Sequence, residues 1–360
     1  MIRDAIAHAL ENRELDAATM DGAMELILAG GATAAQIAAL AIALRMKGET
    51  ASELATAARA LRRHATKVAA PEGVVLDTCG TGGDGAGTIN VSTLAAVVVA
   101  ACGVRVAKHG NRAVSSLCGS ADVLELLGVR TDAAPAQLER LIAEVGLAFL
   151  FAPAHHPALR FAAPVRRELG VRTFFNLLGP LANPAGATHQ LLGVYDRARV
   201  RQLAEVLALL GTRSAWVVSG SGPGGVGVLD EISPFGPTQI AALAEDGSVR
   251  EYELTPAAFG LDVAPPEALR GGDAAHNAAL AGRILAGEAL PARTAVLLNA
   301  AAALVVAGVA ATPREGALQA AHALDTGAAR AKLDAVVDFL SRAQAEDRYT
   351  QRDEPRDEGG

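Results

Sequence analysis

The feature that most constrains this chain is a glycine-rich stretch, residues 77–93, placed between an apolar strand and an apolar helix. Gly73–Asp77 has the short apolar pattern of a buried strand, and Thr93–Cys102 has that of a helix that ends at Gly103. Five glycines lie between Gly80 and Gly87, interleaved with polar residues. Because glycine permits positive φ and has no Cβ, backbone N–H groups can converge there on an anion, beside a helix N-terminus. A turn of this kind can also serve geometry alone, but its polar donors favour a phosphate-binding loop.

Composition limits the partners of the protein. The 360 residues carry a net charge of −7 with a pI near 5.7, which argues against a nucleic-acid or acidic-membrane surface. Three cysteines without a CxxC spacing signal neither a disulfide framework nor a zinc site, so a reducing cytoplasm fits best. The N-terminus lacks a secretory signal, and the apolar run 295–311 predicts a buried helix rather than a membrane span.

The order of patterns predicts an α/β protein with two domains. Residues 1–70 show helical periodicity throughout and predict a small all-helical domain. Its apolar residues would offer a dimer surface, although packing in the core of the domain explains the same pattern equally well. Residues 71–345 alternate strands and helices, which predicts a larger α/β catalytic domain with a mostly parallel central sheet. Residues 346–360 are highly charged and lack apolar anchors, so they predict a disordered tail.

A second polar loop, residues 108–120, follows the next predicted strand, Val104–Ala107. In an open α/β sheet, ligands bind at the carboxyl ends of the strands, so the loops after neighbouring strands should face one crevice. Lys108 would then place a positive charge beside the glycine loop. A solvated surface lysine is the alternative.

Two further groups have chemistry that suits a phosphorylated substrate. Asp230 and Glu231 follow a strand, and such a pair suits a hydrated magnesium ion, although it can also be plain surface. Arg166 lies among apolar residues and could clamp a carboxylate, although it too could be an ordinary surface residue. Gly220–Gly225 matches the dinucleotide-binding pattern by letter, but no apolar helix follows it.

Taken together, these segments resemble the anthranilate phosphoribosyltransferases. The resemblance is carried in one order by Cys79–Asp84, Asn90–Thr93, Lys108–Arg112, Gly119–Asp122, Arg172–Pro184 and Leu229–Ile232, and extends from the N-terminal helices to about Ala343. It implies a nucleoside-phosphorylase-like fold and a magnesium-dependent homodimer. The implied reaction transfers 5-phosphoribose from phosphoribosyl pyrophosphate (PRPP) to the amine of anthranilate, releasing pyrophosphate, in the second step of tryptophan biosynthesis from chorismate.

The resemblance also implies the site residues. PRPP contacts would be Gly80, Gly83, Asp84, Thr88, Asn90, Val91, Ser92, Thr93, Lys108, Ser116 and Ser120; anthranilate contacts Gly80, Asn111 and Arg166; magnesium ligands Ser92, Asp230 and Glu231. The implied catalytic residues are Asp230, Glu231, Lys108 and Arg166. The loop before Asp230 departs from the family, because it is longer and richer in glycine than the usual His-Gly type of turn.

Several alternatives stay open at this point. His109 could accept a proton or could structure its loop. A pyrimidine nucleoside phosphorylase would share the fold, but the Lys-His-Ser start of its glycine signature does not match Asp77-Thr-Cys79. A non-enzymatic relative that binds nucleic acid would need a basic groove and would tolerate loss of the two carboxylates, whereas this chain is acidic and keeps both.

Overall fold

The computed structural model describes residues 1–113 and 118–353, with side chains up to residue 346. Its centre is a sheet in the order β3-β2-β1-β4-β5-β7-β8, with β6 paired to β5. The first five of these strands are parallel, and β6, β7 and β8 are antiparallel to their neighbours. The strands are β1 (Val75–Gly80), β2 (Arg105–Gly110), β3 (Leu147–Phe151), β4 (His189–Gly193), β5 (Ser214–Ser221), β6 (Val228–Leu229), β7 (Thr238–Leu243) and β8 (Val249–Leu254). The predicted mostly parallel α/β sheet is confirmed.

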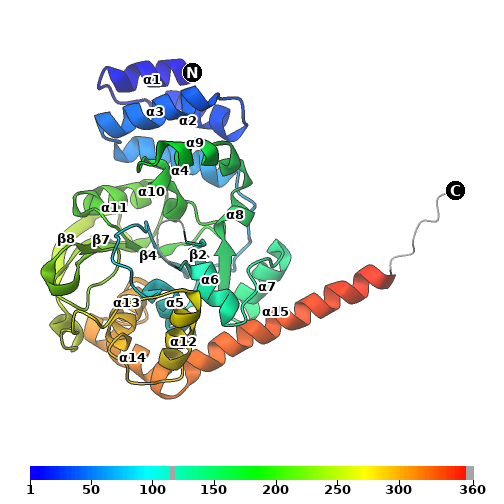
Figure 1. Ribbon diagram of the computed structural model, residues 1–360, viewed down its shortest axis with the longest axis vertical. Helices are drawn as coiled ribbons and strands as arrows, with labels where there is room; N and C mark the ends of the chain where they lie inside the picture. Colours follow the sequence, from blue (N-terminus) through cyan, green and yellow to red (C-terminus); the bar gives the residue numbers. More distant parts are fainter. Residues whose placement is uncertain (114–117, 354–360) are drawn as a thin grey trace.

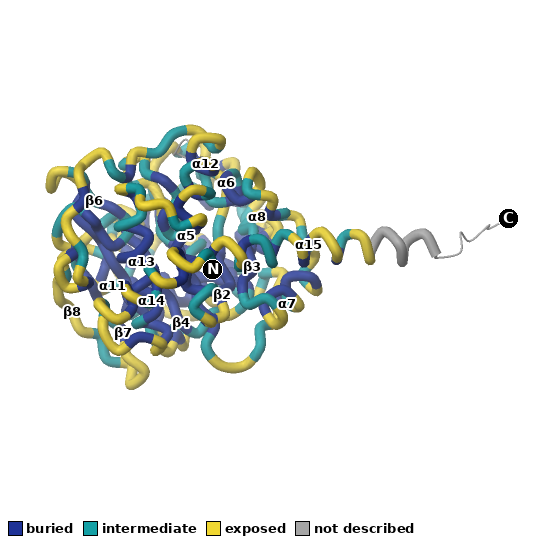
Figure 2. Tube along the Cα trace, turned by 90° about the horizontal axis from the view of Figure 1, so that it is seen from below, coloured by how far each residue is buried: buried dark blue, intermediate teal, exposed yellow. Residues whose placement is uncertain are grey.

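Helices cover both faces of the sheet, because successive strand residues alternate between the faces. Leu191 and Leu192 of β4 belong to different hydrophobic cores, as do Trp216 and Val217 of β5. One core is closed by α5 (Val91–Ala101), α6 (Ser120–Leu126), α7 (Pro135–Glu144), α12 (Ala274–Leu285), α13 (Arg293–Val306), α14 (Pro313–Asp325) and α15 (Ala328–Asp353). The other is closed by α10 (Phe175–Leu181), α11 (Val200–Leu209) and the N-terminal helices. Figure 2 shows the strands in the middle of the sheet buried between these layers, whereas the edge strand β8 is largely exposed.

The N-terminal helices form a layer at one end of the molecule (Figure 1). They are α1 (Ile2–Leu10), α2 (Ala17–Leu28), α3 (Ala34–Lys47) and α4 (Ala51–Arg63). Local signals set their starts: Thr50 accepts a hydrogen bond from the Glu53 N–H at 3.2 Å, and the Glu53 carboxylate accepts one from the Thr50 N–H at 2.8 Å. Glu53 also forms a buried ion pair with Lys47 at 2.9 Å, which joins α3 to α4.

The helical layer contains more of the chain than residues 1–70. A segment from the middle of the sequence joins it: α8 (Ala152–His155), the 3₁₀ helix η1 (Pro157–Phe161) and α9 (Ala163–Leu169). Helix α9 packs against α3 and η1 against α2, and a Cβ at Gly30 would lie 2.7 Å from the Phe161 ring. The helical layer is therefore built from two separated stretches of sequence.

The C-terminal segment differs from its prediction. Residues from Glu346 were expected to be disordered, but α15 continues to Asp353 and projects from the body (Figure 1). Its apolar residues Leu333, Val336, Leu340 and Ala343 are buried at helical spacing, and an Arg140–Glu346 ion pair of 3.4 Å holds the next turn. Arg348, Gln351 and Arg352, which follow, are good helix formers, so the helix propagates beyond its anchored part. Residues 354–360 lie outside the described residues.

The apolar run 295–311 lies mostly in a buried helix, as predicted: α13 has eleven buried residues and ends at Val306, so residues 307–311 follow the helix. Within the described part of the chain, no helix is both long and apolar enough to cross a bilayer.

Candidate active site

The glycine loop and the acidic loop meet at the carboxyl ends of β1 and β4, where the strand order changes direction. Gly80 and Gly193 end these two strands and are paired in register. A Cβ on Gly80 would lie 2.3 Å from Asp230 Oδ2, and one on Gly193 would lie 1.5 Å from the Asp230 carbonyl oxygen. Both positions therefore need glycine for the acidic loop to cross the strand ends. This is the switch point at which open α/β sheets bind their ligands.

Backbone N–H groups bind the two predicted carboxylates. Asp230 Oδ2 accepts a hydrogen bond of 2.7 Å from Gly82 N–H in the glycine loop, and Glu231 Oε1 accepts one of 3.0 Å from Ser92 N–H at the start of α5. Asn299 of α13 fixes the loop behind them, because its side chain bonds both the N–H and the carbonyl oxygen of Ile232, at 2.9 and 3.1 Å. The carboxylates thus face the loop and helix end predicted to bind phosphate.

The electrostatics of this pair are unfavourable in the protein alone. Burial raises the pKa of both Asp230 and Glu231 well above the ordinary carboxyl range, and the charge of Asp84 raises that of Asp230 further. Asp230 in turn raises the pKa of Glu231, which the positive charge of Lys108 lowers. Neither carboxylate has a Lys or Arg nitrogen within 4.0 Å among the described side chains. A cation between the two would relieve their repulsion.

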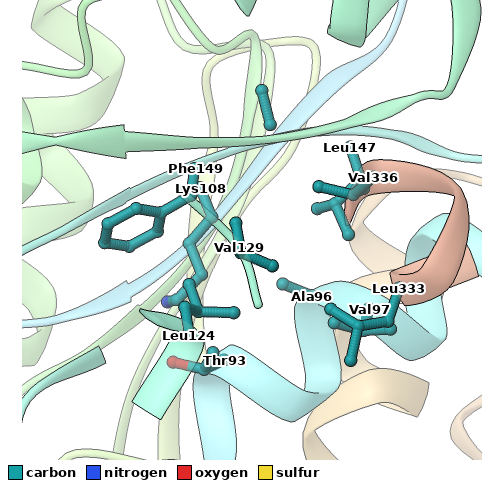
Figure 3. Close-up of a pocket in the computed structure, with 11 residues that line it drawn as sticks. Thr93, Ala96, Val97, Lys108, Leu124, Val129, Leu147, Phe149, Leu333 and Val336 are labelled. Atoms are coloured by element: carbon teal, nitrogen blue, oxygen red, sulfur yellow. The ribbon is translucent and has the colours of Figure 1, made fainter. Parts of the chain in front are cut away.

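Lys108 is buried in the sheet rather than solvated. It lies in β2, because Lys108–Gly110, predicted as loop, continue the strand. Its Nζ donates to the Thr78 carbonyl oxygen and, at 3.2 Å, to Ser92 Oγ. Its stem borders an apolar cavity of about 20 Å³; the amine and the Thr93 hydroxyl lie together at one end of this cavity, and Leu147, Leu333 and Val336 at the other (Figure 3). The amine is therefore held beside the glycine loop and α5.

The other predicted PRPP residues differ in their burial and in their hydrogen-bond partners. Asn90 precedes α5, and its side-chain oxygen accepts a 3.2 Å hydrogen bond from the Asn277 amide of α12. Thr88 pairs with Arg270 in an isolated bridge. Val91 is buried and its N–H donates to Ile89 O at 2.9 Å, whereas the buried Thr93 Oγ1 has no hydrogen-bond partner in the described structure. Ser116 lies outside the described residues.

The two predicted anthranilate side chains come from other parts of the fold than the carboxylates, near the end of β2 and in α9. Asn111 is exposed just after β2, and its carbonyl oxygen accepts a 3.0 Å hydrogen bond from Ser120 Oγ at the start of α6. Arg166 is half-buried in α9, with its guanidinium 5.9 Å from the centre of the Phe175 ring. Among the described side chains, no carboxylate is within ion-pair distance of Arg166, so its planar fork is unpaired. Burial lowers its pKa.

His109 has a structural position. Its Nδ1 is 3.0 Å from the Gly179 carbonyl oxygen, and its ring packs edge-on against His156 with centroids 5.1 Å apart. Burial is the largest cause of a lowered pKa of about 3, so the imidazole is neutral at physiological pH. These contacts favour loop structuring over the alternative of a proton acceptor.

Arg172 belongs to the site but was not assigned a role from the sequence. Its guanidinium donates to the carbonyl oxygens of Gly82, at 3.4 Å, and Gly83, and lies 3.7 Å from the centre of the Tyr195 ring. Its own carbonyl oxygen accepts a hydrogen bond from Arg45 of α3, which ties the helical layer to the glycine loop. The signal was its place inside the Arg172–Pro184 segment, although nothing local indicated these distant contacts.

Comparison with known proteins places the chain in a family. Family models for a glycosyl transferase family match residues 3–65, described as its helical bundle domain, and residues 72–330, described as its a/b domain. An anthranilate phosphoribosyltransferase of Myxococcus xanthus is 54% identical over 337 residues, which is 94% of this chain and 98% of the relative. The chain belongs to the anthranilate phosphoribosyltransferase family.

Solved structures of anthranilate phosphoribosyltransferases have the same fold. The enzyme of Thermus thermophilus is 44% identical with a TM-score of 0.88, covering 94% of this chain and 99% of that one. The enzyme of Saccharomyces cerevisiae in complex with PRPP and Mg is 28% identical with a TM-score of 0.86, covering 95% and 98%. The two matched family domains correspond to the N-terminal helices and the sheet-containing part of this fold.

The glycine-rich loop before Asp230 forms a compact turn. Gly222 N–H donates to the Gly227 carbonyl oxygen at 3.1 Å, and Gly224, Gly225 and Gly227 all have positive φ. The tip is open to solvent, with Val226 78% exposed. The extra glycines therefore close a surface turn between β5 and β6, and Asp230 follows directly.

Proposed function

We propose that this protein transfers 5-phosphoribose from PRPP to the amine of anthranilate, releasing pyrophosphate, in tryptophan biosynthesis. The observation that carries the proposal is the convergence of the glycine loop, Lys108 and the Asp230–Glu231 pair at the switch point of the sheet. Membership of the family, and the yeast relative described in complex with PRPP and Mg, support the same reaction.

The acidic pair fits a magnesium ion. Its oxygens are hard donors, its two carboxylates repel one another, and the Ser92 hydroxyl is near, since Ser92 N–H bonds Glu231. Among the described residues, no three His, Cys, Asp or Glu side chains form a complete metal site, which suits an ion that completes its octahedron with water and substrate oxygens. Asp230, Glu231 and Ser92 would hold the ion, which supplies positive charge against the departing pyrophosphate.

The chain itself contributes binding and orientation. The glycine loop presents N–H groups to the diphosphate, the start of α5 adds the positive end of its helix dipole, and the buried Lys108 amine adds a charge. The ribose carbon gains oxocarbenium character as the pyrophosphate leaves, as in glycoside cleavage. Anthranilate then attacks from the opposite face, and its aromatic amine, already neutral at pH 7, needs positioning more than a strong base.

Arg166 and Asn111 are the proposed acceptor contacts. The half-buried guanidinium lies above the Phe175 ring with its fork unpaired, and a carboxylate could pair with it bidentately. A Saccharomyces cerevisiae relative, 27% identical with a TM-score of 0.84, is described in complex with 4-fluoroanthranilate. Anthranilate has one carboxylate, so a single clamp of this kind would orient it.

We also propose a cytoplasmic homodimer. The helical layer exposes Leu10 at 71% and Met46 at 82%, on α1 and α3, where a second copy could cover them. Sedimentation at several concentrations tests the assembly.

The direct test mixes the protein with magnesium, PRPP and anthranilate and follows the loss of anthranilate fluorescence together with pyrophosphate release. Both changes are expected in parallel. Further arms offer a pyrimidine nucleoside with phosphate, for the phosphorylase alternative, and a DNA duplex at two salt concentrations, for the binding-protein alternative. Phosphorolysis of the nucleoside or salt-dependent binding of the DNA duplex, with anthranilate unconsumed, would overturn the proposal.

The variant Arg166→Ala tests the anthranilate site separately from the PRPP site. Loss of a bidentate charged pair should raise the KM for anthranilate about ten- to a hundredfold and leave the KM for PRPP within about twofold. Arg167→Ala, the exposed neighbour on α9, is the matched control. Unchanged anthranilate kinetics in Arg166→Ala would remove this residue from the site.

A further inference from the structure

Strands β1 and β2 separate at their carboxyl ends. Each is six residues long, but their mutual register contains two pairs, Val75↔Arg105 and Leu76↔Val106. On its other side β1 pairs with β4 up to Gly80, and β2 pairs with β3 up to Gly110. The sheet therefore forks between β1 and β2 at the strand ends that lead into the glycine loop, and Lys108 lies in the forked part of β2.

Side chains replace the missing backbone pairs in the fork. Val106 N–H donates toward β3, so Ala107 and His109 present their backbone groups to β1, because alternate residues face opposite neighbours. His109 N–H donates instead to Asp77 Oδ1 at 3.0 Å, and the Ala107 carbonyl oxygen accepts from Asn183 Nδ2 at 2.8 Å. The Thr78 carbonyl oxygen accepts from Lys108 Nζ.

Asp77 and Asn183 form the centre of the fork. Asn183 Nδ2 also donates to Asp77 Oδ2 at 2.8 Å, and Asn183 Oδ1 accepts from Ala185 N–H at 2.8 Å. Asp77 has no exposed surface and Asn183 is 5% exposed. Burial raises the pKa of the Asp77 carboxyl, and the charge of Lys108 is the largest influence that lowers it. A buried carboxylate without such partners would be strongly unfavourable. Asp77, Asn183 and Lys108 therefore depend on one another for their hydrogen bonds and charge balance.

We propose that Asp77 and Asn183 are positioning residues that hold β1 and β2 apart and thereby aim the Lys108 amine at the pyrophosphate of the substrate. The inference rests on the proposed function for the identity of that anion. Were the ladder closed, the Thr78 carbonyl would pair with β2 backbone, and the Lys108 amine would lose the acceptor that now orients it. Asp77 also supplies the negative charge that a buried lysine needs.

A double-mutant cycle tests whether Asp77 acts through Lys108. Binding of magnesium-PRPP is measured by calorimetry for the wild type, Asp77→Asn, Lys108→Met and the double variant, together with kcat and both KM values. Asp77→Asn should weaken PRPP binding about ten- to a hundredfold on the wild-type background, as expected for loss of charged hydrogen bonds, and less than about twofold on the Lys108→Met background. The KM for anthranilate should stay within about twofold.

The controls separate positioning from stability. Leu207→Ala in the buried core of α11 should lower the melting temperature and leave PRPP binding unchanged at temperatures where it is folded. Asn183→Ala removes the second side chain of the fork and keeps the charge of Asp77. It should also weaken PRPP binding on the wild-type background and not on the Lys108→Met background, by a smaller factor than Asp77→Asn. Equal factors on both backgrounds, or full PRPP affinity in Asn183→Ala, would overturn the inference. Wild-type protein that does not bind PRPP would instead contradict the proposed function.

Discussion

Two acidic centres interact electrostatically with Lys108, and they differ in how completely the protein satisfies their hydrogen bonds and charges. Asp77 is fully buried, and both of its oxygens accept N–H hydrogen bonds, from His109 and Asn183. Asp230 and Glu231 are half-buried neighbours whose charges repel, with Asp84 adding to the repulsion. Burial raises the pKa at both centres. The difference teaches that the centre with complete hydrogen bonds has a structural role, whereas the pair whose charges repel is the proposed magnesium site.

The largest expected effect comes from neutralising Asp230 or Glu231, which should lower activity while raising the stability of the metal-free protein. Asp230→Asn and Glu231→Gln should each lower turnover at saturating PRPP by about a hundredfold or more, because the charge that would hold magnesium is lost. The same changes remove repulsion, so the metal-free melting temperature should rise by about a few degrees. Steady-state kinetics and calorimetric melting measure both.

Asp77→Asn is the counterpart in that experiment. It replaces an acceptor by a group that also carries donors, facing the N–H groups of His109 and Asn183, so its melting temperature should fall. If the Asp230 and Glu231 variants were destabilised as much as Asp77→Asn, the proposed contrast between the fully hydrogen-bonded Asp77 and the mutually repelling Asp230–Glu231 pair would be wrong.

The next effect concerns pH and magnesium. The pKa values of Asp230 and Glu231 are raised in the folded protein, so the folded state favours their protonated forms. Their favourable contribution to stability is therefore fully present below the unfolded carboxyl pKa of about 4 and is lost as the pH rises through the raised folded values. The metal-free protein should lose stability from about pH 4 toward neutral and slightly alkaline pH.

Magnesium should counter this loss of stability, because at the proposed site it would bind the deprotonated pair. At about a hundredfold excess over its dissociation constant, it should add roughly 2.7 kcal/mol to the free energy of unfolding. Melting temperatures near pH 5 and pH 8, with and without magnesium, measure the effect, which should be larger at the higher pH and absent in Glu231→Gln. An equal magnesium shift at both pH values would place the ion elsewhere.

Much of the site follows from the sequence because its signals are local. The strand, glycine loop and helix around residues 77–93 are contiguous, and the parallel sheet brings Lys108 and Asp230–Glu231 to the same edge as that loop. The fork could not be predicted, because Asn183 and Asp77 are 106 residues apart and nothing in the sequence around either residue indicates that they meet. The same holds for Arg172 on the glycine loop and for α8–α9 in the helical layer, which depend on tertiary packing.

A smaller effect is expected from Arg172, which holds the glycine loop. This loop follows the strand of Asp77 and donates the Gly82 N–H to Asp230. Arg172→Ala removes its hydrogen bonds to Gly82 and Gly83 and its contact with the Tyr195 ring, so the loop must be ordered when PRPP binds. The KM for PRPP should rise about tenfold, with the KM for anthranilate unchanged. Tyr195→Phe keeps the ring and should stay close to wild type. A lower KM for PRPP in Arg172→Ala would mean that the arginine holds the loop in a form that opposes binding.

The smallest effect tests whether the Lys108 amine depends on the space beneath its stem. The cavity of about 20 Å³ is lined by Val336 of α15, on the side away from the Lys108 amine (Figure 3). Val336→Ile adds one methylene, which should raise the free energy of unfolding by at most about 0.8 kcal/mol and leave the kinetics unchanged. Val309→Ile, 43% exposed, is the control and should change neither. Because the fork fixes Lys108 from the β1 side, filling the cavity should not move the amine. A fall in PRPP affinity with Val336→Ile would show that the stem uses this space, and that Asp77 and Asn183 do not fix the amine by themselves.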